Sequence, residues 1–387
     1  SPEEAPACAL AARLERGSTQ TMTPTGTADT VRLFWWYRFQ GRRRSVPEPE
    51  TFQCAGHDGL MRCVSDSRES AFDAAHGVVI WSGPDHRRGT CLPPQRAEHT
   101  WVLEFSEPAD VDPLTTSELY SEAFMGRFEV KVSHERSSDV VLTALHPLVE
   151  GGVISPDRWL NPASQQRAMV WLASPKKSLG CSTSNRRDEL VRRLERALGP
   201  TTPVHSVGRC LHNHDHPVLQ GKQSDGGGNQ STWMSKIRVL SEYAFCLITE
   251  NSITHDYVTE KIFHAFAAGC FPVYYGTEDV THFLPTPEAV LQVLQYPSLR
   301  ALVGTVEALA ANRTEYRARM AWRHDTALTR AWWERMLTMT QAAETPSKPA
   351  IFCAVCRAVQ RHRADKHRTR LRVAPRPSDE FWPPLAI

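Results

Sequence analysis

The sequence predicts an α/β fold with two domains, each built on a parallel sheet. At 387 residues the chain is longer than the size at which a single hydrophobic core stops growing. It also contains short, nearly continuous apolar runs rich in aromatic and β-branched residues, which are typical of strands buried on both faces. These runs are residues 31–37, 77–81, 101–105, 168–173, 243–249 and 271–275.

The last two runs flank a stretch with helical character. Residues 259–268 carry apolar side chains at helical spacing, and Gly269 follows directly as a residue suited to end a helix. A strand, a helix and a second strand in this order form a βαβ unit. We therefore predict that residues 243–249 and 271–275 pair in parallel.

Composition outside these runs suggests the domain limits. Residues 1–30 are rich in Ala, Thr, Ser and Pro without a sustained period, so we predict a flexible stem remnant. Polar residues 156–166 separate two strand-bearing halves, which places one domain at 31–165 and a second at 166–345. Residues 346–387 remain as a C-terminal segment.

Charge and hydropathy argue against several function classes. The chain has 45 basic and 43 acidic residues and a formal charge of +2, so no global field would recruit nucleic acid. No run approaches the roughly 20 apolar residues of a membrane helix. The chain begins at Ser1 without a signal-like apolar region, and we expect that a native membrane anchor is absent from it.

The most informative stretch is the polar segment 250–261, between a predicted strand and the first turn of a helix. A helix N-terminus at the carboxyl end of a parallel strand offers free N–H groups to a phosphate. Lys261 would add a compact positive charge, while Asn251, Tyr257 and Glu260 could bind sugar hydroxyls. Taken alone, the segment is equally consistent with an ordinary capped helix whose Glu and Lys face solvent.

Two patterns resemble metal sites. Asp110-Val111-Asp112 is an acidic triplet in a Pro-flanked stretch, and such triplets are common by chance. A second pattern, His212, His214 and His216 with Asp215, lacks a matching cysteine pair, which disfavours zinc. We therefore predict no metal site.

Two further motifs remain open from sequence alone. The Cys353-Ala354-Val355-Cys356 motif suits zinc, redox chemistry or disulfides equally. Two glycosylation sequons, at Asn229 and Asn312, are compatible with a lumenal protein.

The motifs in the C-terminal half resemble family-10 α1,3/4-fucosyltransferases. The pattern Phe-x-Leu-x-x-Glu-Asn-Ser, four residues, then Tyr-Val-Thr-Glu-Lys and a Gly-x-x-Pro-Val strand is found here from Phe245 to Val273. Upstream, residues 181–187 are similar to Cys-Gly-Ala-Arg-Asn-x-Arg of plant-like core α1,3-fucosyltransferases, which the cysteine pattern resembles most. The resemblance implies a GT-B fold, in which two Rossmann-like domains face each other across a cleft. It also implies GDP-fucose as donor, with Arg187 and Ser174 among the donor-binding residues.

The match is sparser in the N-terminal half. Residues 101–108 resemble a family segment that places Glu107 on the proposed catalytic base, although Glu98 and Glu104 lie on or near the same strand. Residues 133–140 resemble a second segment and imply donor contacts from His134 and Arg136.

The resemblance also implies disulfides. It pairs Cys181 with Cys210. It further ties Cys353 and Cys356 back to the N-terminal domain, with Cys54 and Cys63 as partners, so that segment 346–387 returns to that domain. Cys246 and Cys270 lie in predicted core strands, and we expect them to be buried thiols.

Together these features predict an inverting enzyme that transfers L-fucose from GDP-fucose to a glycan hydroxyl in α1,3 linkage. The expected acceptor is the N-acetylglucosamine of an N-glycan core or of N-acetyllactosamine. A protein O-fucosyltransferase, a transferase using another nucleotide sugar and a catalytically silent glycan-binding member are the alternatives. We expect no required cofactor, with a divalent cation at most stimulatory, and a location in the Golgi lumen rather than the endoplasmic reticulum.

Overall fold

The computed structural model describes most of the two sheets and their helices. The described residues are 4–16, 30–36, 49–56, 59–81, 91–105, 108, 121–142, 155, 159–162, 164–175, 181, 183, 185–219, 230–339 and 350–365. They fall into two compact units: the first takes its residues from 1–142 and 339–375, the second from 143–338. No helix of the described residues is long and apolar enough to cross a membrane.

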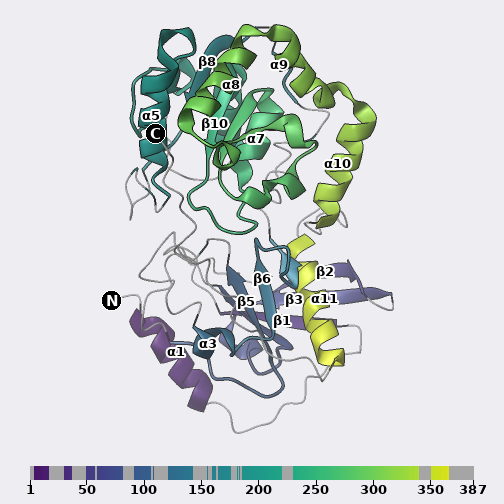
Figure 1. The fold of residues 1–387 in the computed structure, drawn as a ribbon. Helices are drawn as coiled ribbons and strands as arrows, with labels where there is room; N and C mark the ends of the chain where they lie inside the picture. The colour runs from purple at the N-terminus through teal and green to yellow at the C-terminus, as the bar shows by residue number, and fades with distance from the viewer. Residues whose placement is uncertain are drawn as a thin grey trace. The chain divides into compact units, whose positions relative to one another are not determined.

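The first unit is built on a seven-stranded sheet of order β2-β3-β1-β4-β5-β6-β7 (Figure 1). All neighbouring strands pair in parallel except β2 and β3, which are antiparallel. Its elements are α1 (Glu4–Arg16), β1 (Thr30–Trp36), β2 (Glu50–Ala55), β3 (Leu60–Asp66), β4 (Gly77–Trp81), β5 (Thr100–Phe105), α3 (Glu122–Met125), β6 (Val130–Ser133), β7 (Val140–Val141) and α11 (Ala350–Ala364).

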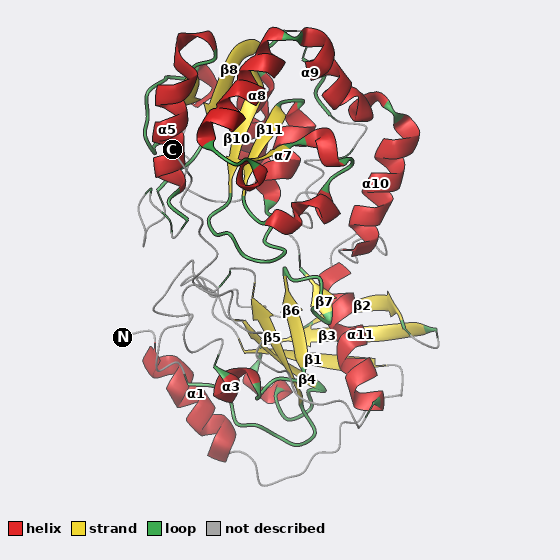
Figure 2. Ribbon diagram, viewed as in Figure 1, coloured by secondary structure: helices red, strands yellow, loops and turns green. Residues whose placement is uncertain are grey.

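Helices cover both faces of this sheet (Figure 2). Apolar side chains of α11 pack against Val31, Val79 and Val102 on one face. On the other face, Leu14 of α1 joins a core with Phe34. The prediction of a flexible segment over residues 1–30 is therefore wrong for residues 4–16, because an apolar side chain of this helix is buried in the core.

The second unit has a five-stranded parallel sheet of order β12-β11-β10-β8-β9. Its α-helices and strands are β8 (Gln166–Trp171), α5 (Arg187–Leu198), β9 (Val204–Ser206), α6 (Gln230–Ser241), β10 (Tyr243–Thr249), α7 (Glu260–Ala268), β11 (Phe271–Tyr275), β12 (Leu291–Gln292), α8 (Leu299–Ala311), α9 (Arg313–Met320) and α10 (Thr326–Met339). Helices α5 and α8 pack on the same apolar core as the strands. Two α/β units on largely parallel sheets confirm the predicted fold class.

The predicted βαβ unit is present. Strands β10 and β11 have the predicted limits and pair in parallel, and α7 ends at Gly269, whose φ of 73° suits glycine. The sequence did not predict β2, β3, β6, β7, β9 or β12. Four of these strands, β6, β7, β9 and β12, have at most four residues, and β2 is mostly exposed. Strand β3 is longer and largely buried, but the polar residues Arg62, Ser65 and Asp66 interrupt its apolar pattern.

The predicted domain boundary at 165 lies inside the second unit. The Leu160 main chain hydrogen-bonds to Ala267 of α7, and the ring of Trp159 packs on Trp322 and Trp332. These contacts attach the polar stretch before β8 to the second unit, which is why the boundary lies earlier in the chain than its composition suggested.

Candidate donor-binding site

A buried carboxylate organises the segment between β10 and α7. Glu250 follows β10 directly, and its side chain has no exposed surface. Its Oε1 accepts from the Thr259 main-chain N–H at 2.9 Å, and its Oε2 accepts from the Thr259 hydroxyl at 2.6 Å and from Lys261 Nζ at 2.8 Å. Three donors therefore compensate a charge that burial would otherwise make very costly.

The same network fixes Lys261 in the first turn of α7. Its Nζ also donates to the Thr259 hydroxyl at 2.6 Å, and the side chain keeps 25% of its surface exposed. Burial lowers the pKa of Lys261, but the carboxylates of Glu250 and Glu260 outweigh that effect, so the net pKa is raised. The Lys261 ammonium group is thus held in place by Glu250 and Thr259, and its side chain remains partly exposed.

Glu260 stays ionised beside it. Burial raises the pKa of Glu260, but Lys261, His264 and Lys236 together lower it to about 2. An ionised carboxylate accepts hydrogen bonds and donates none, so Glu260 suits a ligand hydroxyl. The predicted contact of Glu260 with a sugar hydroxyl stays a prediction.

Arg187 approaches from the preceding βα unit. It is the first residue of α5 and is 3% exposed, and its Nη1 donates to Asn251 Oδ1 at 2.6 Å. Its Nε is buried without a hydrogen-bond partner among the described residues. Burial lowers its pKa, with partial compensation from Glu250 and Tyr257. A buried guanidinium with an unused donor is suited to an anion.

The fold explains why these side chains meet. Strands β8 and β10 are parallel neighbours, so the segments that follow them share one edge of the sheet. Asn185 connects the two segments: its Nδ2 donates to the Glu250 carbonyl at 2.8 Å, and its own carbonyl accepts from the Tyr275 hydroxyl at 2.9 Å. Ser174 lies three residues beyond β8 at the same edge, and Tyr257 is 3% exposed within the β10–α7 segment.

Comparison with known proteins shows which family the chain belongs to. The sequence model of "Glycosyltransferase family 10 (fucosyltransferase) C-term" matches residues 162–373, more than half of the chain. The chain belongs to glycosyltransferase family 10. The matched range contains the whole β8–β12 sheet and every residue of the candidate cluster Arg187, Asn251, Glu260 and Lys261.

Individual relatives are distant. Alpha-(1,3)-fucosyltransferase B of Drosophila melanogaster is 26% identical over 293 residues, covering 74% of this chain and 60% of the relative. GDP-fucose protein O-fucosyltransferase 3 of Danio rerio is 24% identical over 299 residues, 77% of this chain and 60% of the relative, and that of Homo sapiens is 25% identical over 291 residues, 73% and 57%. The chain thus spans about 60% of the length of these family members.

The solved structures that match this chain include "Crystal Structure of alpha1,3-Fucosyltransferase with GDP-fucose". Its TM-score with this chain is 0.47 at 14% identity, over 89% of this chain and 99% of the other.

Predicted site residues also lie in the first unit of this family-10 chain. His134 and Arg136 follow β6, and the His134 ring is 4% exposed and packs edge-on against Phe105. Glu107 and the triplet Asp110 to Asp112 lie outside the described residues. The donor roles of His134 and Arg136 and the base role of Glu107 stay predictions.

The two competitors of Glu107 differ in where they lie relative to β5. Glu98 is exposed and precedes the strand, whereas Glu104 is half-buried and is the second-to-last residue of the strand, next to Phe105. Desolvation raises the pKa of Glu104 to about 7, and no described residue donates to its carboxylate. The two carboxylates thus differ in burial, and a catalytic role for either stays untested.

Disulfides connect the cysteines for which the resemblance implied pairs. Cys54 is bonded to Cys353 and Cys63 to Cys356, which attaches α11 to β2 and β3. A third bond joins the cysteines at 181 and 210, and Cys91 is also disulfide-bonded, while the Cys8 side chain lies outside the described part of the chain.

One expectation about the cysteines is wrong. Cys246 and Cys270 were expected to be buried thiols, but they form a disulfide with a Cα–Cα distance of 5.8 Å. Cys246 lies opposite Pro272 in the parallel pairing of β10 and β11, which brings it beside the residue that precedes β11. The sequence indicated that both cysteines are buried, but the distance between their side chains depends on how β10 and β11 pair.

The sequence missed one cluster of potential metal ligands. His255, Asp256 and Asp279 place ligand atoms within 4.8 Å of one another, and within the described residues no other such group is found. His255 Nε2 lies 3.3 Å from Asp256, and its Nδ1 contacts Asp279. A cation bound by these three side chains would replace one of these contacts of the His255 ring. The histidines at 212, 214 and 216, which the sequence disfavoured as a zinc site, make separate contacts with Asp215, His205 and Glu242.

The supporting residues Glu250, Thr259 and Asn185 were also not predicted as functional. Glu250 had a signal in the sequence, because a carboxylate directly after a buried strand must find cationic or N–H partners. Asn185 had none, since its role depends on the parallel pairing of β8 with β10.

Proposed function

We propose that this chain transfers L-fucose from GDP-fucose to an acceptor hydroxyl with inversion at the anomeric carbon. The observation that carries the proposal is the pair of cations at the carboxyl edge of the second sheet. Lys261 is held in the first turn of α7, and Arg187 keeps a buried, unused N–H donor at the start of α5. Family membership and the names of fucosyltransferase relatives support fucose as the transferred sugar.

The reaction needs charge compensation at the leaving group. As the acceptor oxygen forms its bond to C1 of fucose, the bond from C1 to the β-phosphate oxygen breaks and the electron pair leaves with GDP. Arg187 and Lys261 would stabilise the charge that grows on this diphosphate. Two protein cations can supply this compensation, so we expect turnover without added metal. The His255, Asp256 and Asp279 cluster is where a stimulatory divalent cation would bind.

The acceptor hydroxyl must also lose its proton. A carboxylate on the acceptor side takes it up, as the general base does in inverting glycosidases. We assign this role to Glu107 on the strength of the sequence resemblance. Glu107→Gln should remove turnover while leaving GDP-fucose affinity unchanged, and near-normal turnover would refute the assignment. Glu104→Gln in parallel shows whether the neighbouring carboxylate carries the role instead.

The acceptor class has two candidates. The sequence favours a glycan, with α1,3 transfer to N-acetylglucosamine of an N-glycan core or of N-acetyllactosamine. The second candidate is a protein hydroxyl, because relatives from several vertebrates are named GDP-fucose protein O-fucosyltransferase 3. Both acceptor classes are compatible with the secretory pathway, and we propose the Golgi lumen.

The deciding experiment measures GDP release from GDP-fucose with two acceptor panels, free N-glycans and secreted protein domains lacking N-glycans. If only one of the two panels stimulates GDP release, that panel identifies the acceptor class. Fucose transfer without added metal, and in the presence of a chelator, tests the metal-independent chemistry. GDP-fucose binding without GDP release on either panel would instead identify a silent member, and no binding of GDP-fucose would overturn the proposal.

A further inference from the structure

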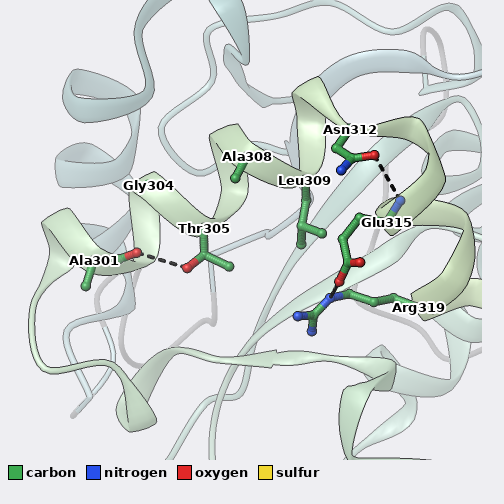
Figure 3. A pocket seen from close by; sticks show the side chains of 8 residues that line it. All are labelled: Ala301, Gly304, Thr305, Ala308, Leu309, Asn312, Glu315 and Arg319. Carbon is green, nitrogen blue, oxygen red and sulfur yellow. Dashed lines mark hydrogen bonds and ion pairs between the residues drawn. The ribbon is translucent and has the colours of Figure 1, made fainter.

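A groove lies between α8 and α9, on the side of α8 that carries small residues. It has a volume of about 400 Å³ and is largely open to solvent. Gly304 and Ala308 are exposed along one wall, and a Cβ atom added to Gly304 would meet no heavy atom within 4 Å. Leu309 forms part of the lining, and the ion pair of Glu315 with Arg319 lies on the α9 side (Figure 3).

Asn312 lines this groove at the junction of the two helices. It is exposed and caps α9: its Oδ1 accepts from the main-chain N–H groups of Thr314 and Glu315, both at 3.1 Å. Figure 3 shows the carboxamide oxygen turned toward the backbone of α9 and the nitrogen turned away from it. Among the described residues, none accepts from Nδ2. The cap therefore occupies the oxygen and leaves the nitrogen available.

This division of atoms matters because Asn312 begins the sequon Asn312-Arg313-Thr314. N-glycosylation replaces one Nδ2 hydrogen and keeps the side-chain carbonyl. Helix capping needs only the carbonyl oxygen. Asn312 can therefore carry a glycan and cap α9 at the same time, whereas an asparagine that used its nitrogen in a buried hydrogen bond could not.

We propose that Asn312 carries an N-linked glycan whose first sugars lie in the groove between α8 and α9. The sugar would come from a lipid-diphosphate-linked oligosaccharide of the secretory pathway. Nδ2 forms a bond to C1 of the first N-acetylglucosamine and loses a proton, while the C1–O bond to the lipid diphosphate breaks. The small side chains of Gly304 and Ala308 let a sugar ring approach α8, and Glu315 and Arg319 offer hydrogen-bond partners to its hydroxyls. The proposal does not depend on the proposed transferase activity.

The modification is tested by secreting the chain from a eukaryotic cell line and measuring the mass of the peptide that contains Asn312. We expect a glycopeptide in the wild-type chain and the unmodified mass in both Asn312→Asp and Thr314→Ala. The first variant keeps a capping oxygen and the second keeps the Asn312 cap, so neither loses the helix start. Asn229→Asp, in the other sequon, is the control and should leave the Asn312 glycopeptide unchanged. Unmodified Asn312 in the secreted wild-type chain would overturn the proposal.

The position of the glycan is tested by hydrogen exchange in α8. We expect amides 301–309 to exchange at least about threefold more slowly in the glycosylated chain than in Thr314→Ala, because the sugars cover that face. Ala308→Trp fills the groove and should abolish this difference while Asn312 stays glycosylated. Equal exchange in the wild-type chain and Thr314→Ala would mean that the glycan projects into solvent, which overturns its placement in the groove.

Discussion

The two units are both α/β folds on largely parallel sheets, but their disulfides join cysteines at very different separations along the chain. In the first unit the bonds Cys54–Cys353 and Cys63–Cys356 join residues 299 and 293 positions apart. In the second unit, Cys181–Cys210 and Cys246–Cys270 span 29 and 24 positions. The core of the first sheet therefore includes side chains of α11, near the C-terminal end of the described residues, whereas the core of the second sheet comes from one continuous stretch of the chain.

Each unit has a glutamate near the carboxyl end of a central strand, and the two glutamates differ in their hydrogen-bond partners. Glu250, after β10, is fully buried and receives hydrogen bonds from Thr259 and Lys261. Glu104, on β5, has no described donor, and desolvation raises its pKa to about 7. The same residue type thus holds a cation in place in one unit and has a raised pKa in the other, because, of the two, only Glu250 has hydrogen-bond donors among the described residues.

The largest expected effect concerns the disulfides. Replacing all four cysteines of the two long bonds by Ala should lower the free energy of unfolding of the first unit by about 5 kcal/mol, because a loop of this length loses the most entropy when closed. Breaking Cys54–Cys353 alone should cost much less, because Cys63–Cys356 still closes nearly the same loop. Chemical denaturation under oxidising conditions measures both.

The matched control is Cys246→Ala with Cys270→Ala in the second unit, for which the shorter loop predicts a loss of about 3 kcal/mol. Equal losses for the long and the short bonds would show that loop length does not distinguish the units.

The next effect concerns the cation that Glu250 positions. Lys261→Ala should lower kcat/KM for GDP-fucose by about 10²- to 10³-fold, because a preorganised charge at the leaving group is lost. Steady-state GDP release and GDP-fucose binding give the two measurements. Arg317→Ala, an exposed cation on α9, is the control and should have no effect. A Lys261→Ala variant that binds GDP-fucose as tightly as the wild type would exclude a donor contact.

Glu250→Gln tests the buried carboxylate itself. It keeps the shape of the side chain but leaves the Lys261 ammonium without its counter-charge, which should cost about 3 kcal/mol, the lower end for a broken buried pair because Lys261 is 25% exposed. Thermal and chemical unfolding provide the measurement. Glu315→Gln, which breaks the more exposed pair with Arg319, should cost less than about 1 kcal/mol. Similar costs for the two variants would contradict the role of Glu250.

The smallest effect is a pH dependence in the first unit. Because the pKa of Glu104 is raised to about 7, its favourable contribution is present below the unfolded value of 4.5 and is lost as the pH rises to 7. Glu104→Gln should therefore stabilise the chain by about 1–3 kcal/mol at pH 8 and have little effect at pH 4. Glu98→Gln, at the exposed end before β5, should be neutral at both pH values. Stabilisation that does not change with pH would mean that Glu104 titrates normally.

The sequence by itself determined the local elements whose patterns repeat over several residues. Buried runs gave β4, β10 and β11 their limits, and Gly269 marked the end of α7. The polar segment 250–261 was singled out because helix N-termini at strand ends are a known setting for phosphates, whereas Arg187 was singled out by the resemblance of residues 181–187 to a family motif. Short or exposed strands such as β2 and β7 carry too little periodicity to be found this way.

Only the tertiary structure decided which distant groups meet. The contact of Arg187 with Asn251, the Cys246–Cys270 bond and the His255–Asp279 contact each join residues that lie on or next to different strands. Their closeness results from which strands are neighbours in the sheet, and strand order is set by the packing of the whole unit. A local pattern reports which face of an element is buried, but it does not report which partner lies beside it.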